Sequence, residues 1–330
     1  MSTDQAHAVA GHYDRQPRRD RLERREERTG GIRAFNNWCK SVLIDLALQG
    51  VPRRAPVHVL DLACGVGGDL GKYAMRARSH NVRGYVGVDA SARSIHIAQE
   101  RQAEERAARG SGRDLDVRWV VADLGEGPAP LPADAPAPAL VSCQFALHYA
   151  CSDTRTLLSW LSNAAGPLAR GGRFVCTYPN AETLGALHAR SGAPRVLEDA
   201  AAGWSMEFDL GTDRDCDRDE DTQGDGVAAL RHAQLGQRYL MSLDGSLTRC
   251  PEYMAPFVAI ETLAARLGLR VERRWRALGE LFAEFSGTQP YHERLFKMKL
   301  AEPGSGRLLL SEAQWNFVQL YEAVLFVKDE

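Results

Sequence analysis

Between residues 56 and 179, short apolar runs typical of buried strands alternate with segments that have helical periodicity. The expected strands are 56–63, 85–90, 117–124, 138–145 and 173–179, and the expected helices are 66–78, 91–110 and 154–172. Alternation of this kind predicts an α/β fold with a parallel, doubly wound sheet. The carboxyl ends of such strands meet along one edge of the sheet, where ligands bind in this architecture.

A glycine loop, DLACGVGGD at residues 61–69, joins the first expected strand to its helix. Glycines let a ligand approach the backbone and the helix N-terminus closely. The dinucleotide fingerprint GxGxxG is not completed, because Leu70 occupies its last glycine position. Asp61 and Asp69 would repel a pyrophosphate but not the ammonium and sulfonium of S-adenosylmethionine. A plain strand–helix turn with solvated carboxylates is the alternative interpretation.

Two further carboxylates follow the next strands. Asp89 ends the second strand, 24 residues after Gly65, where a ribose acceptor is found in related folds. Asp123 ends the third strand and is placed to meet an adenine amino group. Acids at successive strand ends favour a nucleoside-bearing ligand.

The fourth strand ends in SCQFALHY, residues 142–149. Phe145, His148 and Tyr149 bring flat rings together, and Gln144 adds a hydrogen-bonding group beside them. This combination favours a flat, polar ligand such as a nucleobase. Each residue alone has a plain alternative, since Phe145 also suits an ordinary core and His148 a satisfied half-buried histidine.

Composition excludes several classes of protein. The chain has 330 residues, 44% hydrophobic and 25% charged, which suffices for a folded core. Its net charge of −2 argues against indiscriminate binding to nucleic acid. Its seven cysteines show neither CxxC nor metal-ligand spacing, so we expect no metal site. With a hydrophilic start and no long apolar run, we expect a soluble intracellular protein that does not contact a membrane.

Charge patterns divide the chain further. We expect a basic N-terminal arm over 1–34 and a catalytic domain over 35–330, with an acidic insertion at 209–226. The arginine-dense segment 15–33 fits either contact with phosphates or a solvated helix face. We expect a helix around 252–268 and later strands that extend the same sheet.

Several motifs occur in a recognisable order: IRAFNNWCKSVLI, DLACGVGGDL, GVDAS, SCQFALHY, TYPN and PEYMAPF. With them the chain resembles the eukaryotic and viral messenger-RNA cap (guanine-N7) methyltransferases. The resemblance implies a class I S-adenosylmethionine-dependent methyltransferase with a Rossmann-like sheet. It weakens in the loop 125–138, which is rich in proline and alanine, in the acidic insertion and in residues 280–310.

The resemblance also implies roles for individual residues. It implies cofactor contacts for Lys40, Asp61, Gly65, Asp69, Asp89, Asp123, Gln144 and Tyr149. It implies contacts with the cap for Asn36, Asn37, Phe145, His148, Tyr149, Pro179, Glu252 and Tyr321. Lys40 is expected to meet the cofactor carboxylate, and Glu252 to accept from the guanine edge. None of these residues is expected to act by acid–base chemistry; Phe145, His148, Tyr149 and Glu252 position the guanine.

One departure from the family pattern concerns phosphate binding. The family usually has lysine within CGKGG, whereas this chain has Val66. Arg18, Arg19, Arg24 and Arg25 are candidates to meet the cap triphosphate instead.

The expected reaction is methyl transfer from S-adenosylmethionine to N7 of the guanosine in a 5′ GpppN RNA cap, by in-line attack without a general base. Alternatives are a catalytically weak cap-binding or stimulatory subunit, or a methyltransferase for another nucleobase or a small molecule. Expected partners are capped RNA and a capping guanylyltransferase, triphosphatase or RNA polymerase. We expect a monomer in the nucleus, with a cytoplasmic viral replication site as the alternative.

Overall fold

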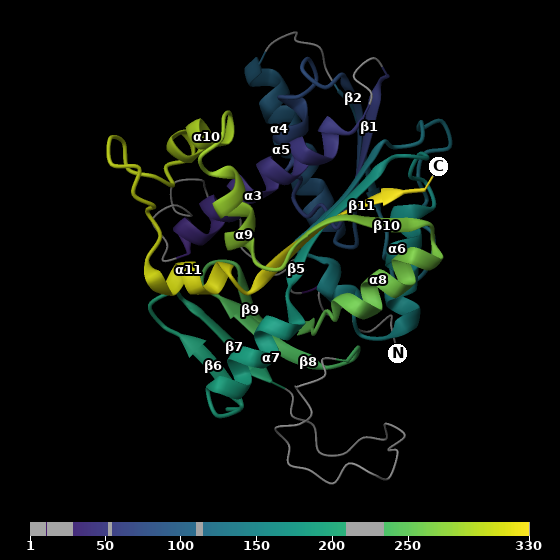
Figure 1. Cartoon of the computed structure of the whole chain (residues 1–330). Coiled ribbons are helices and arrows are strands. Elements are labelled where there is room, and N and C mark those ends of the chain that lie inside the picture. The colour runs from purple at the N-terminus through teal and green to yellow at the C-terminus, as the bar shows by residue number, and fades with distance from the viewer. Residues whose placement is uncertain (1–10, 12–28, 52–54, 110–114, 209–233, 330) are drawn as a thin grey trace.

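The structure is a computed structural model that describes residues 11, 29–51, 55–109, 115–208 and 234–329 (Figure 1). Arg18, Arg19, Arg24 and Arg25, like the acidic insertion 209–226, lie outside the described residues. Among the described helices, none combines the length and apolar character that a bilayer crossing requires.

A seven-stranded sheet forms the centre of the molecule, with the strand order β10-β11-β5-β4-β1-β2-β3. Its strands are β1 (Val57–Leu62), β2 (Val82–Asp89), β3 (Asp116–Val121), β4 (Leu140–Gln144), β5 (Arg173–Pro179), β10 (Leu269–Trp275) and β11 (Tyr321–Lys328). Strands β5 to β3 pair in parallel, while β11 is antiparallel to both of its neighbours. The expected doubly wound α/β sheet is confirmed.

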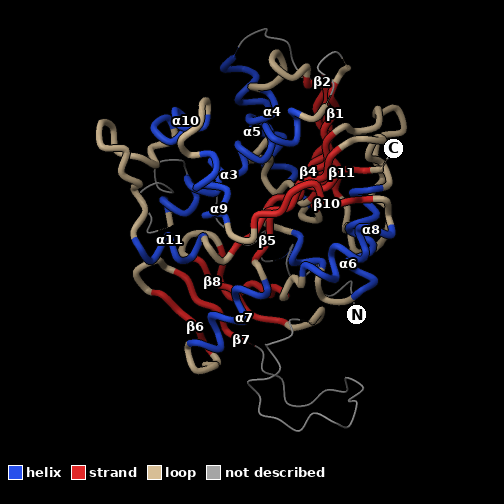
Figure 2. Tube along the Cα trace, in the orientation of Figure 1, coloured by secondary structure: helices blue, strands red, loops and turns tan. Residues whose placement is uncertain are grey.

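Helices cover both faces of this sheet (Figure 2). The described helices are α3 (Gly30–Gln49), α4 (Leu70–Ala74), α5 (Ala92–Arg109), η1 (Leu147–Ala150), α6 (Thr154–Ala165), α7 (Ala181–Arg190), α8 (Phe257–Arg266), α9 (Leu278–Phe285), α10 (Tyr291–Lys297) and α11 (Glu312–Val318). Helices α3 and α9 pack in one apolar core, and α6 and α8 in a second core across the sheet. Double coverage explains why β4 is buried along its whole length.

Local sequence determines where these helices begin and which face they bury. The carboxylate of Asp153 caps α6 by accepting from the Thr156 amide, and the Asn180 side chain caps α7 in the same way. Helix α3 buries Phe35 and Trp38 completely. Its opposite side carries Asn36, Asn37 and Lys40 toward the carboxyl ends of the strands.

A second sheet, which the sequence analysis did not expect, lies beside those strand ends (Figure 1). It is antiparallel, with the order β6 (Val196–Asp199), β7 (Trp204–Phe208), β8 (Arg238–Leu243) and β9 (Leu247–Tyr253). Of the described strands after β5, β10 and β11 alone extend the central sheet. The expectation that all later strands do so is therefore wrong.

Two expected helices are shorter than predicted. The helix expected over 66–78 is limited to α4, because Gly65 and Gly67 have positive φ angles of 53° and 66° and form a turn instead. The helix expected around 252–268 begins only at Phe257, after Pro256. Glu252 consequently lies on strand β9 and not at a helix start.

Candidate functional site

A cavity of about 620 Å³ opens at the carboxyl ends of β1, β2 and β4, between the central sheet, helix α3 and the second sheet. Its wall includes Asn36, Asn37, Lys40, Asp61, Gly65, Asp69, Asp89, Asp123, Gln144, Phe145, His148, Tyr149, Glu252 and Tyr321. The structure thus brings together nearly all the residues that the sequence pointed to, although they come from distant parts of the chain.

Pro179 is the exception, because it does not line the cavity. It is buried at the end of β5 and pairs with Tyr321 on β11. Tyr321 reaches the wall, so Pro179 supports the site from behind.

The glycine loop leaves open space on the cavity side. A Cβ built at Gly65 or Gly68 would meet nothing within 4 Å, whereas one at Gly67 would lie 2.6 Å from the Trp119 ring. The Gly65 amide donates to Oδ2 of Asp89 at 2.8 Å. Asp89, at the end of β2, therefore fixes the position of the glycine loop. The loop leaves open space in which a ligand can approach its backbone.

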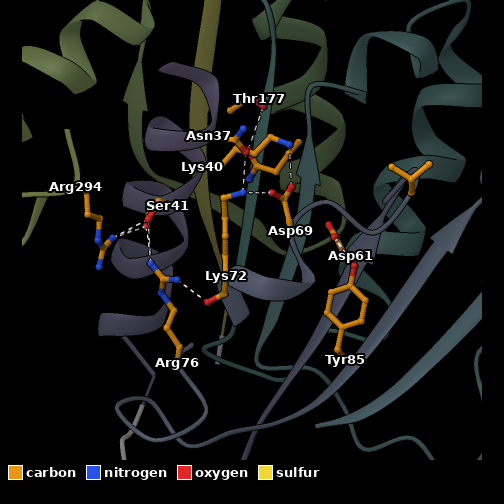
Figure 3. A network of polar contacts seen from close by, with 12 residues as sticks. Asn37, Lys40, Ser41, Asp61, Asp69, Lys72, Arg76, Tyr85, Thr177 and Arg294 are labelled. Carbon is orange, nitrogen blue, oxygen red and sulfur yellow. Dashed lines mark hydrogen bonds and ion pairs between the residues drawn. The ribbon is translucent and has the colours of Figure 1, made fainter. Parts of the chain in front are cut away.

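Asp69 lies between two lysines at the base of the cavity (Figure 3). Lys40 Nζ lies 2.9 Å from its Oδ2, and Lys72 Nζ lies 2.7 Å from its Oδ1. Burial favours a higher pKa for Asp69, but the two lysines outweigh burial and hold that pKa below its usual range. Lys72 also donates to Oδ1 of Asn37 at 2.9 Å, so one buried ammonium orients two wall residues.

Asp61, on β1, has the opposite electrostatic environment. Burial and the nearby negative charge of Asp69 raise its pKa to about 7, against a hydrogen bond from Tyr85 and the charge of Lys40. The Tyr85 hydroxyl donates to Oδ2 of Asp61 at 2.7 Å. A cationic group bound beside Asp61 would stabilise its charged form.

Behind the lysines, a buried ionic network ties α3 to α4 and α10 (Figure 3). Arg76 and Arg294 both pair with Asp45, and Arg76 also donates to the Ser41 and Lys72 carbonyls. This network fixes the backbone of α3 beside Lys40 and the backbone of α4 at Lys72.

Aromatic rings form the opposite part of the wall. The Phe145 and Tyr321 ring centroids are 5.3 Å apart at 57°, and those of His148 and Tyr149 are 4.2 Å apart at 44°. Lys40 Nζ lies 5.5 Å from the Phe145 centroid. These four rings form the aromatic slot, and Phe145 lies at its boundary with the carboxylate region.

Glu252 reaches this slot from β9 and is only 2% exposed. Its Oε2 accepts from the Tyr239 hydroxyl at 2.8 Å, and its Oε1 accepts from Tyr149 at 3.4 Å. His148 Nε2 lies 3.3 Å from Oε1 without hydrogen-bond geometry. A fixed carboxylate beside these aromatic rings suits a flat ligand with N–H donors on one edge.

These geometric features agree with a comparison of sequences. The sequence pattern of the mRNA (guanine-N(7))-methyltransferase domain matches residues 1–329. The chain belongs to this family.

Two curated relatives show how much of a longer protein of this family the chain corresponds to. The chain is 27% identical over 357 residues to the mRNA cap guanine-N(7) methyltransferase of Aspergillus niger, covering 98% of this chain and 55% of the relative. The corresponding protein of Cryptococcus neoformans var. neoformans (strain B-3501A) is 29% identical over 330 residues, covering 97% and 41%. The chain spans about half the length of these two curated relatives.

A solved structure shows the same fold. The plantazolicin methyltransferase BamL, in complex with a triazolic desmethylPZN analog and SAH, superposes with a TM-score of 0.51 at 10% identity. The match covers 100% of this chain and 98% of that chain. The expected Rossmann-like methyltransferase architecture is confirmed.

Several residues of the cavity wall were not predicted from the sequence, among them those at the turn between β8 and β9. Leu243 at the end of β8, Gly245 and Ser246 in the turn that follows, and Leu247 and Thr248 at the start of β9 line the cavity, as does Arg33 on α3. The Arg33 guanidinium donates to the Ser246 hydroxyl at 3.2 Å, and Thr29 donates to the Asp244 carbonyl at 2.8 Å. The dipeptide Asp244-Gly245 between apolar runs is a hairpin signal that predicts this loop.

Proposed function

We propose that this chain transfers a methyl group from S-adenosylmethionine to N7 of the guanosine in a 5′ GpppN RNA cap. One observation carries the proposal: in a chain of this family, Glu252 and the rings of Phe145, Tyr149 and Tyr321 line the same cavity as the glycine loop and its carboxylates. A purine slot and a nucleoside site that share one cavity are what transfer between two nucleosides requires.

Recognition of guanine rests on the fixed carboxylate. Guanine presents N1–H and a 2-amino group on one edge, and Glu252 can accept from both. Adenine has no donor at N1, so it would leave one carboxylate oxygen unsatisfied. Because Tyr239 and Tyr149 already orient the carboxylate, little side-chain freedom is lost when guanine binds.

Methyl transfer to N7 requires that the protein position the two reactants, and it requires no general base. Guanine N7 carries a free lone pair, so no proton has to leave before it attacks. Stacking on the aromatic wall contributes about 1–3 kcal/mol per base, and alignment of reacting groups can lower a barrier by roughly 7–11 kcal/mol. His148 therefore needs no acid–base role.

The residues on the other side of the cavity fit the methyl donor. S-adenosylmethionine supplies, when bound, a methyl group on a positively charged sulfur. We propose that Lys40 binds its carboxylate and Asp61 its ammonium, while Asp89 and Asp123 bind its ribose and adenine. The open space over Gly65 and Gly68 leaves room for the cofactor to lie against the backbone of the glycine loop.

The proposal extends to partners and location. A cap guanine arises only after a triphosphatase and a guanylyltransferase have acted on the RNA end. We therefore propose that this chain acts after those activities, beside them or an RNA polymerase, in the nucleus. Co-purification of tagged protein and its localisation by microscopy test this part.

The central assay uses S-adenosylmethionine labelled on its methyl group and RNA with an unmethylated GpppN end. We expect label on this RNA and none on RNA with a 5′ triphosphate. Calorimetry with S-adenosylhomocysteine is run on the same preparation. Cofactor binding without transfer would contradict the proposal and favour a silent cap-binding subunit; transfer to the uncapped RNA would favour another nucleobase.

A further inference from the structure

Thr177, on β5, lies directly behind two neighbouring residues of the cavity wall. It is fully buried and does not line the cavity. Its hydroxyl donates to Oε1 of Gln144 at 3.2 Å and accepts from the backbone amide of Phe145 at 2.7 Å. The single hydroxyl proton is used for Gln144 and a lone pair for Phe145, so the group is matched to both partners.

Phe145 needs this support because its backbone has an unusual conformation. Its φ angle is 58°, in the left-handed region that residues with a Cβ rarely adopt. Its amide is held by both the carbonyl and the hydroxyl of Thr177, at 3.0 and 2.7 Å. This conformation directs the strand end into η1, which carries His148 and Tyr149. Strained residues of this kind persist where surrounding contacts determine them.

Gln144 depends on the same hydroxyl. The residue is 8% exposed, and it lines the cavity. With Oε1 bound to Thr177, its Nε2 is buried and has no hydrogen-bond partner among the described residues. A buried amide donor without a protein partner costs free energy unless a ligand satisfies it.

We propose that Thr177 is a positioning residue for methyl transfer: its hydroxyl fixes the Gln144 amide as a donor toward the bound ligands and fixes the Phe145 ring in the slot. The inference rests on the proposed function, and it adds a residue that contacts neither substrate nor cofactor. Thr177 acts on both the cofactor region and the cap region, because its hydroxyl contacts Gln144 and also Phe145, which lies at the boundary between them. Its role requires the hydroxyl and not the side-chain volume.

Two variants separate the hydroxyl from the volume. Thr177→Val keeps the shape and removes the hydroxyl, while Thr177→Ser keeps the hydroxyl and removes a methyl group. We expect kcat/KM for capped RNA to fall at least about tenfold in T177V and to stay within about threefold of wild type in T177S. Thermal unfolding is measured for both. A purely structural role predicts that activity follows stability, with the cavity-forming T177S variant also impaired.

The possible results are distinct. Wild-type activity with an equally active T177V overturns the inference and leaves the proposed function intact. Absence of wild-type methyl transfer contradicts the proposed function; the crystal structure of T177V then decides the inference. A displaced Gln144 amide or a changed Phe145 backbone supports it, and an unchanged wall overturns it.

Discussion

The hydroxyl of Tyr239 on β8 donates a hydrogen bond of 2.8 Å to Oε2 of Glu252 on the neighbouring strand β9. Both side chains are almost completely buried, with exposures of 0% and 2%. The carboxylate is therefore held in one orientation before any ligand arrives. Preorganised acceptors of this kind discriminate strongly, because a ligand without the matching donors leaves them unsatisfied.

Glu252→Gln tests this recognition most simply. The amide keeps the size of the side chain but replaces an acceptor with a donor that opposes the guanine edge. Hydrogen bonds to charged groups contribute about 1.5–3 kcal/mol, so we expect kcat/KM for capped RNA to fall about 10- to 100-fold. Affinity for S-adenosylhomocysteine should change less than about threefold by calorimetry.

Caps containing inosine, which lacks the 2-amino group, provide the control for E252Q. Wild-type protein should prefer GpppG over IpppG, and the variant should lose that preference. Tyr239→Phe, which keeps the carboxylate, should retain it with a smaller loss of activity. An unchanged preference in E252Q would show that Glu252 does not contact the 2-amino group.

Asp89→Ala should weaken binding of S-adenosylhomocysteine at least about tenfold. The change removes the proposed ribose acceptor and also the acceptor of the Gly65 amide, so the cradle loses its support. Asp134→Ala is a matched control, because Asp134 is an exposed aspartate that pairs with Arg118 outside the cavity. Equal affinities of D89A and D134A in calorimetry would contradict the assignment of the loop.

Substitutions of the two lysines that pair with Asp69 should have different effects: one mainly on stability and the other mainly on cofactor binding. Lys72 has a side-chain exposure of 10% and Lys40 one of 20%, and only Lys40 lines the cavity. We expect Lys72→Met to lower the free energy of unfolding by about 3 kcal/mol and Lys40→Met by about 1 kcal/mol, measured by urea denaturation. Cofactor affinity should fall more in K40M. The reverse pattern would mean that Lys72 is the direct ligand.

Asp61 should make stability depend on pH. Its pKa in the folded chain is about 7, against an ordinary value of 3.8. The folded state therefore binds a proton that the unfolded state has released between these values, and stability falls as pH rises through this window. The full effect is at most about 4 kcal/mol.

Asp61→Asn removes this titration and serves as the comparison. Relative to wild type, D61N should be more stable at about pH 8 than at about pH 5, as measured by urea denaturation at both values. A difference between the two proteins that does not change with pH would show that folding does not raise the pKa of Asp61.

The sequence predicted best what depends on strand order alone. Asp61, Asp89 and Gln144 lie at the carboxyl ends of β1, β2 and β4, three neighbouring parallel strands, and the geometry of such a sheet brings them to one edge. Their meeting around one cavity follows from the alternation of strands and helices and from the glycine loop, without knowledge of side-chain contacts.

What the sequence did not predict depends on packing between distant segments. A helix was expected around 252–268, but it begins only after Pro256, and the residues around Glu252 form β9, which pairs with β8. Lys72 was not singled out, because a lysine on a helix is exposed by default. Its burial becomes understandable only when Asn37 and Asp69 are seen beside it. Thr177 was likewise not singled out, because the sequence shows it only as one residue of an apolar strand, and its hydrogen bonds appear only in the structure.

Caps built from 7-deazaguanosine test the central claim most directly. They keep the N1–H, the 2-amino group and the flat ring that the slot is proposed to bind, but they lack the nitrogen that is proposed to attack. With S-adenosylmethionine labelled on its methyl group, we predict transfer to GpppG-RNA, release of labelled 7-methylguanosine on digestion, and no transfer to the 7-deaza cap, which should still compete for binding. Equal labelling of both caps, or label on any other atom, would contradict the account.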